Sequence, residues 1–88
     1  MLQEQTNLKT AKEAAAIAIE YYQRISGAYS NAIVEEIELS EDNQRWLITL
    51  GIRSPHALSL YGKEDVSYKV FTVDSLTGEV ISMKIKKI

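Results

Sequence analysis

The sequence of 88 residues contains no cysteine, one histidine and one proline. The lack of cysteine excludes disulfide bonds, thiol catalysis and metal sites built on thiolates. One histidine cannot form a zinc site, and the acidic residues between positions 35 and 42 lack the spacing of a calcium-binding loop. The glycines are isolated and form no phosphate-binding loop. We therefore expect no metal and no cofactor.

Long apolar runs and an excess of positive charge are also missing. No segment approaches the roughly 18–20 apolar residues of a membrane span, so we expect no membrane insertion. A net charge of −2 gives no basic surface for nucleic acid. Residues 1–10 lack the basic segment and apolar core of a signal peptide. These features favour a cytoplasmic protein, with an exported form that has lost its signal peptide as the alternative.

Catalytic residues are equally scarce. A minimal hydrolase would depend on His56, with Ser54, Ser59 and Asp65 in the same segment, but no Gly-x-Ser-x-Gly motif surrounds these serines. An exposed loop histidine explains His56 better. We expect no catalytic residues and no enzymatic activity.

What the sequence does contain is a globular composition, with 45% hydrophobic and 25% charged residues. A chain of this length forms one domain, which we place at residues 10–88 after a loose lead-in at residues 1–9. Thr10 and Glu13 have the spacing of a capping box, and good helix formers follow from Ala11 to about Ser26. Gly27 is placed to end this helix.

Apolar residues at helical spacing predict one broad buried face: Ala14, Ile17, Ala18, Tyr21, Tyr22 and Ile25.

After the helix the pattern changes to strands, predicted over residues 32–39, 45–53, 66–74 and 79–88. Turns are expected at residues 40–44 and 74–78, with Asp74 opening the second turn and Gly78 supplying a positive φ near its end. Short connections favour an antiparallel meander, so the predicted fold is α+β, with one N-terminal helix packed on a four-stranded sheet. Alternation puts three sets of apolar residues on shared faces: Ile33, Ile37 and Leu39; Trp46, Ile48, Leu50 and Ile52; and Ile81, Met83 and Ile85.

Residues 54–65 form an unusually long connection between two of these strands. This segment either packs against the sheet or presents apolar side chains to a partner. On the second reading the candidate binding residues are Pro55, His56, Leu58, Leu60 and Tyr61.

The first and last predicted strands carry opposite charges. Glu35, Glu36 and Glu38 lie in the first, whereas Lys84 and Lys86 lie in the last. Charges on edge strands ordinarily prevent strand-to-strand aggregation. Opposite charges also allow the alternative of a homodimer formed through the sheet edges.

The last strand pair holds the most specific local pattern. Residues 68–74 end in Asp, and residues 77–80 read Thr-Gly-Glu-Val. This hairpin, with the preceding helix and the strand of residues 34–39, resembles the PepSY domain over residues 11–39 and 66–83. The resemblance implies a cystatin-like helix across a curved sheet, and a role in binding or restraining a peptidase. The leading hypothesis is therefore a small protein-binding module that engages another protein through the exposed face of the sheet or through residues 54–65. The alternative is a small-ligand carrier or sensor with a pocket between helix and sheet.

Overall fold

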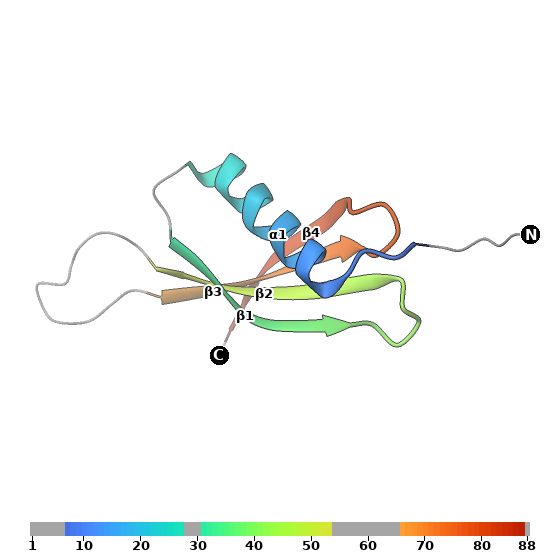
Figure 1. The fold of residues 1–88 in the computed structure, drawn as a ribbon. Coiled ribbons are helices and arrows are strands. Elements are labelled where there is room, and N and C mark those ends of the chain that lie inside the picture. The colour runs from blue at the N-terminus through green and yellow to red at the C-terminus, as the bar shows by residue number, and fades with distance from the viewer. Residues whose placement is uncertain (1–6, 28–30, 54–65, 88) are drawn as a thin grey trace, which may run out of the picture.

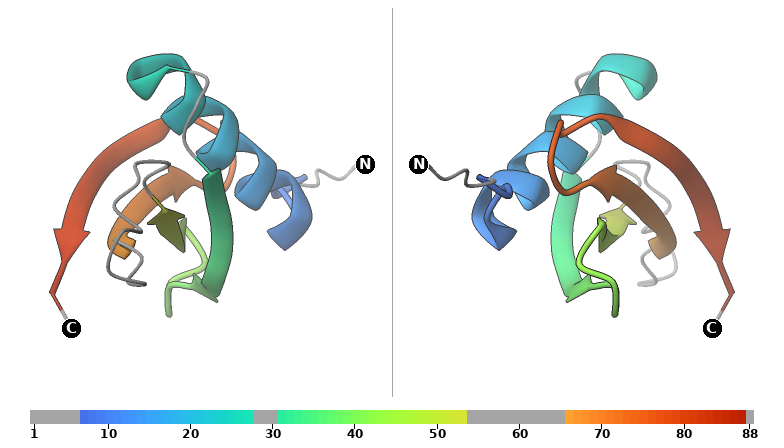
Figure 2. Two further views of the ribbon diagram at one scale, coloured as in Figure 1. Left: turned by 90° about the vertical axis from the view of Figure 1, so that its left-hand side faces the viewer. Right: turned by 90° about the vertical axis from the view of Figure 1, so that its right-hand side faces the viewer.

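The computed structural model describes residues 7–27, 31–53 and 66–87. One helix, α1 (Ala11–Ser26), precedes four strands: β1 (Asn31–Leu39), β2 (Arg45–Arg53), β3 (Val66–Asp74) and β4 (Val80–Lys86). The strands form one antiparallel sheet in the order β1-β2-β3-β4, with α1 packed against it (Figure 1). The predicted α+β meander is therefore confirmed. Figure 2, which views the molecule from its two ends, shows how strongly the sheet is twisted.

The capping box holds the start of α1. The Thr10 hydroxyl accepts a hydrogen bond from the Glu13 N–H at 3.1 Å, and the Glu13 carboxylate accepts one from the Thr10 N–H at 2.8 Å. Two of the amide groups that a helix leaves without partners are thus satisfied. At the other end Gly27 takes a φ of 91°, and its N–H donates to the Gln23 carbonyl. Both predicted helix ends are confirmed.

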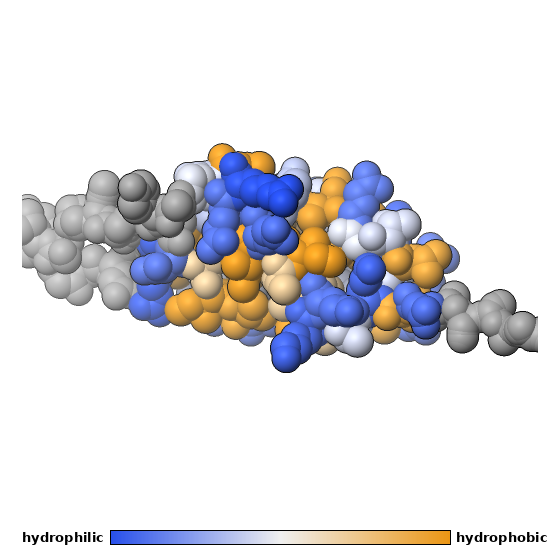
Figure 3. Space-filling model, turned by 45° about the horizontal axis from the view of Figure 1, so that its top comes forward, coloured by the Kyte–Doolittle hydropathy of each residue, from blue (hydrophilic) through white to orange (hydrophobic). Residues whose placement is uncertain are grey.

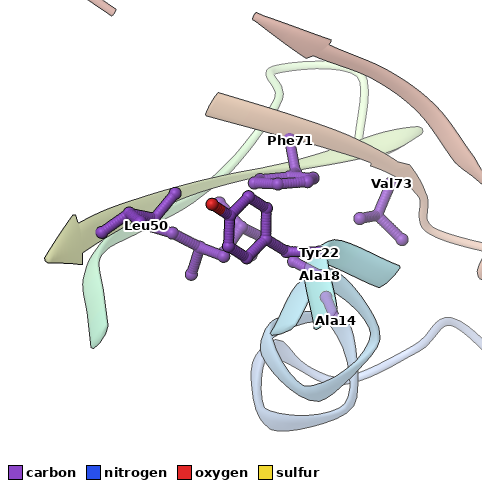
Figure 4. Packing of buried hydrophobic residues seen from close by; sticks show 8 residues of the cluster. Ala14, Ala18, Tyr22, Leu50, Phe71 and Val73 are labelled. Carbon is purple, nitrogen blue, oxygen red and sulfur yellow. The ribbon is translucent and has the colours of Figure 1, made fainter. Parts of the chain in front are cut away.

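The core lies between α1 and the two central strands. Ala14 and Ala18 are fully buried, and their small side chains let the helix backbone approach the sheet. Tyr22 packs beside Leu50 and Phe71 (Figure 4). The Phe71 ring meets Tyr21 and Tyr22 edge to face, with ring centroids 6.3 and 6.2 Å apart. The residues of β2 and β3 that complete this core are Ile48, Ile52 and Val73.

A β-bulge interrupts β1 and changes which residues share a face. Val34 pairs with Leu50 and Glu36 pairs with Thr49, which leaves Glu35 as the extra residue. Ile33 lies opposite Gly51, whereas Ile37 lies opposite Ile48. The prediction that Ile33 shares a face with Ile37 and Leu39 is therefore wrong, because it assumed unbroken alternation.

A second bulge lies at the start of β4. Val80 pairs with Val73 and Ser82 pairs with Thr72, so that Ile81 is the extra residue. The predicted alternation holds from there on, since Met83 lies opposite the buried Phe71. Ile85 follows on the same face, beside Lys69. The strand itself is shorter than the predicted span of residues 79–88.

Hydrogen bonds tie the chain before α1 to one end of the sheet. The Lys9 N–H donates to the Ser75 carbonyl at 2.6 Å, and the Trp46 indole N–H donates to the Lys9 carbonyl at 2.9 Å. Ser75, only 2% exposed, donates its hydroxyl to the Asn43 carbonyl at 2.7 Å. Residues 7–9 of the predicted lead-in thus reach the helix along a fixed path, while residues 1–6 lie outside the described part.

Candidate protein-binding surface

The face of the sheet opposite α1 is covered by no helix in the described part of the chain. We call it the open face. Strand pairing and the alternation of side chains define its members. They are Asn31, Ile33, Glu36 and Glu38 of β1, Arg45, Leu47, Thr49, Gly51 and Arg53 of β2, Val66, Tyr68, Val70, Thr72 and Asp74 of β3, and Ser82, Lys84 and Lys86 of β4.

The bulge in β1 adds Glu35 to the open face. A Cβ atom built on Gly51 would lie 2.5 Å from the Glu35 carboxylate, so the Glu35 side chain occupies the space above this glycine. Glu36, the next residue, lies opposite Thr49 on the same face. Two consecutive glutamates therefore point to one side of the sheet, which regular alternation forbids. Together they make the β1 margin of the open face acidic.

An ion pair spans the open face from one edge of the sheet to the other. The Lys86 ammonium of β4 lies 3.2 Å from a Glu36 carboxylate oxygen of β1. Since β2 and β3 separate these strands, the sheet must curl toward the open face for the side chains to meet. Both side chains are about half exposed, and such pairs contribute only about 0–1 kcal/mol to stability. The ion pair therefore contributes little to stability, but its position shows that the sheet is curved.

The floor of the open face is more buried than a bare sheet surface. Thr49 is 6% exposed, and its neighbours Leu47, Tyr68 and Val70 are half buried. Curvature and the long charged side chains at the margins shield these residues. The result is a half-apolar surface with an acidic margin along β1 and a basic margin along β4.

A hollow of about 410 Å³ lies where the two hairpin turns meet the chain before α1. In one turn the Asp42 carboxylate accepts hydrogen bonds from the Ser40 hydroxyl and the Gln44 N–H, which lower its pKa. In the other, the Thr77 and Leu76 N–H groups lower the pKa of Asp74. Both carboxylates thus hold turns in place. The described residues contain no cluster of metal-ligating side chains.

A smaller hollow of about 180 Å³ lies beside α1, lined in part by Ile17, Tyr21 and Val80. Ligand pockets usually measure some 300–1,000 Å³. The centre of the interface between helix and sheet is filled instead, because Ile48, Leu50 and Phe71 are fully buried there (Figure 4).

Apolar side chains also reach the surface on the helix side of the sheet. Figure 3 shows them gathered beside the helix, over the first strand, while hydrophilic side chains cover the outer side of α1. Ile37 of β1 is 39% exposed, and Met83 and Ile85 of β4 are 38% and 70% exposed. Both edge strands therefore leave apolar surface uncovered.

The sequence-predicted binding residues Pro55, His56, Leu58, Leu60 and Tyr61 lie outside the described residues. The open face corresponds to the other predicted binding surface, the exposed face of the sheet. The sequence did not predict that the Glu35 side chain lies over Gly51. The available signal was the two consecutive glutamates in a strand predicted to alternate.

No family model, no curated protein and no solved structure matches the chain. Within the described ranges, no helix is long and apolar enough to cross a bilayer.

Proposed function

We propose that the protein is a non-enzymatic protein-binding module that engages its partner through the open face. The observation that carries this proposal is the combination of a half-buried apolar floor with one acidic and one basic margin. Apolar contact area supplies affinity, and the charged margins fix the orientation of a partner.

The resemblance of the last hairpin to the PepSY domain supports a peptidase as the partner class. The helix across an antiparallel sheet is the arrangement that this resemblance implies. A peptidase segment with charges complementary to the two margins would lie on the floor formed by Thr49, Tyr68 and Val70. A cytoplasmic location remains part of this proposal, on the grounds given by the sequence.

Site-specific photocrosslinking in the native host tests the proposal. A photoreactive residue replaces Thr72 on the open face, and the matched control replaces Gln23 on the exposed side of α1. We expect one peptidase to be crosslinked from position 72 and not from position 23. The crosslinked protein is then purified, and its Kd is measured for wild type, Thr72→Lys and Gln23→Lys.

Binding weakened at least tenfold by Thr72→Lys, with Gln23→Lys unchanged, is the expected result. Equal effects of the two substitutions would place the contact elsewhere. If the crosslinked protein is not a peptidase, the proposal of a protein-binding module stands, but the proposal that its partner is a peptidase is refuted.

The alternative of a small-ligand carrier or sensor was predicted with a pocket between helix and sheet, where buried side chains fill the centre. The hollow at the turns is the site that we propose for this alternative instead. A compound that binds there would raise the melting temperature with concentration, because it stabilises the folded state alone. Loss of that rise in Leu76→Ala, whose side chain lines the hollow and is 52% exposed, would establish this site.

A further inference from the structure

The two edge strands of the sheet, β1 and β4, carry complementary side chains on each face of the sheet. On the open face, β1 presents Glu36 and Glu38, whereas β4 presents Lys84 and Lys86. On the helix side both edges are apolar, with Ile37 and Leu39 on β1 and Met83 and Ile85 on β4. Within the described residues each strand pairs on one side only, with β2 and β3 respectively. The outer backbone groups of both strands therefore remain available for a further strand.

The meander also gives the two edges compatible directions. With four antiparallel strands, β1 and β4 run in opposite directions. A second copy placed beside the first in the same orientation thus brings its β1 antiparallel to β4, with both helices on one side. If Lys86 lies opposite Glu36 of the second copy, Lys84 lies opposite Glu38. The same register sets Ile85 against Ile37 and Met83 against Leu39.

The contact between Lys86 and Glu36 within one chain shows that these side chains attract one another. Because both are about half exposed, exchanging this pair for one between copies costs little. The exchange would cover the most exposed apolar side chain of β4, Ile85, which is 70% exposed. Edge lysines oppose pairing of β4 with another β4, but they favour pairing with the acidic β1.

We propose that the protein self-associates by pairing the β4 edge of one copy with the β1 edge of another. This inference goes beyond the proposed function, since it concerns the edges rather than the open face and a second copy rather than a different protein. Two copies that pair through both edges form a closed dimer, and a contact that does not close extends into a chain.

Charge exchange between the edges tests the proposal. One variant, Lys84→Glu with Lys86→Glu, has two acidic edges, and the other, Glu36→Lys with Glu38→Lys, has two basic edges. Their masses are measured by sedimentation velocity over a range of concentrations at low salt, with circular dichroism to confirm folding. We expect wild type to associate, and each variant alone to remain monomeric because like charges face one another. An equimolar mixture of the two variants should associate again, since each acidic edge then meets a basic one.

The matched control for Lys84→Glu with Lys86→Glu is Lys12→Glu with Arg24→Glu, which changes the net charge by the same amount on the exposed side of α1. It should associate as wild type does, and added salt should weaken association of the wild type and of the mixture alike. Dimers and longer chains both support the contact if the mixture reproduces them. A wild type that stays monomeric at high concentration and low salt would overturn the proposal, as would a folded mixture that fails to associate.

Discussion

Single residues at the turns show how local chemistry holds the sheet in register. Asp74 ends β3, and its carboxylate accepts two backbone N–H groups of the following turn, each at 2.8 Å. Gly78 completes the turn with a φ of 81°, a conformation that favours glycine. The sequence predicted both roles, because an aspartate and a glycine at these positions are the chemical requirement of such a turn. In the other turn Asn43 takes a positive φ of 62°, which no expectation covered.

Asp74 should make stability depend on pH in a defined direction. The N–H groups of Thr77 and Leu76 lower the pKa of this carboxyl in the folded protein. A lowered pKa means that the stabilisation is present above the unfolded value of about 3.9 and is lost as the pH falls through the folded value. We expect Asp74→Asn to be less stable than wild type at neutral pH, and the difference to shrink in acid below about pH 4. Urea unfolding midpoints of both proteins, measured as a function of pH, check this.

Glu41→Gln serves as the control for the loss of one negative charge, because Glu41 is exposed in the other hairpin turn. A difference between Asp74→Asn and wild type that stays constant down to acid pH would show that the backbone hydrogen bonds do not favour the charged form.

At the scale of elements, local rules predicted the helix better than they predicted the strands. Thr10, Glu13 and Gly27 define the ends of α1 through chemistry confined to a few neighbours. The faces of β1 and β4 depend instead on pairing with distant residues, since each bulge exists only relative to its partner strand. The sequence of β1 carries apolar residues on both sides of Glu35 and Glu36, so that alternation alone misplaced Ile33.

Removing the capping hydroxyl should destabilise the protein without changing its fold. Thr10→Ala deletes the acceptor of the Glu13 N–H and should cost about 1 kcal/mol of unfolding free energy. For a domain of this size that loss corresponds to roughly 4–8 °C in Tm. Thermal unfolding followed by circular dichroism measures the shift. Thr10→Ser keeps the hydroxyl and should retain most of the stability, so equal losses in the two variants would refute the capping role.

At the scale of the whole molecule, the order of strands followed from the sequence but the shape of the open face did not. Short turns and alternating strands allow few arrangements, and the meander is the simplest of them. The curl of the sheet, by contrast, depends on its bulges and twist, which bring Lys86 to Glu36 across two intervening strands. The open face is a product of this curl. The sequence predicted one acidic and one basic edge strand, but no local pattern predicted that the curl brings the two edges together.

Helix α1 covers β3 more completely than it covers the end of β4, and this difference leads to a final prediction. Phe71 and Ile85 lie on the same face, but Phe71 is fully buried under Tyr21 and Tyr22, whereas Ile85 is 70% exposed. Phe71→Ala should cost about 3–5 kcal/mol through lost contacts and the cavity left behind. That is a large share of the roughly 5–15 kcal/mol that stabilises a typical domain. Urea unfolding, at a concentration where the protein is monomeric, measures the loss.

Ile85→Ala is the matched comparison and should change stability by no more than about 0.5 kcal/mol, because its side chain is largely in water already. Phe71→Leu keeps most of the apolar volume and should fall between the two, which distinguishes a cavity from a general disturbance of β3. Similar losses for Phe71→Ala and Ile85→Ala would mean that the helix covers both strands evenly. In that case the β4 edge would offer little apolar surface to a second copy, and the self-association proposed for it would lose its apolar contribution.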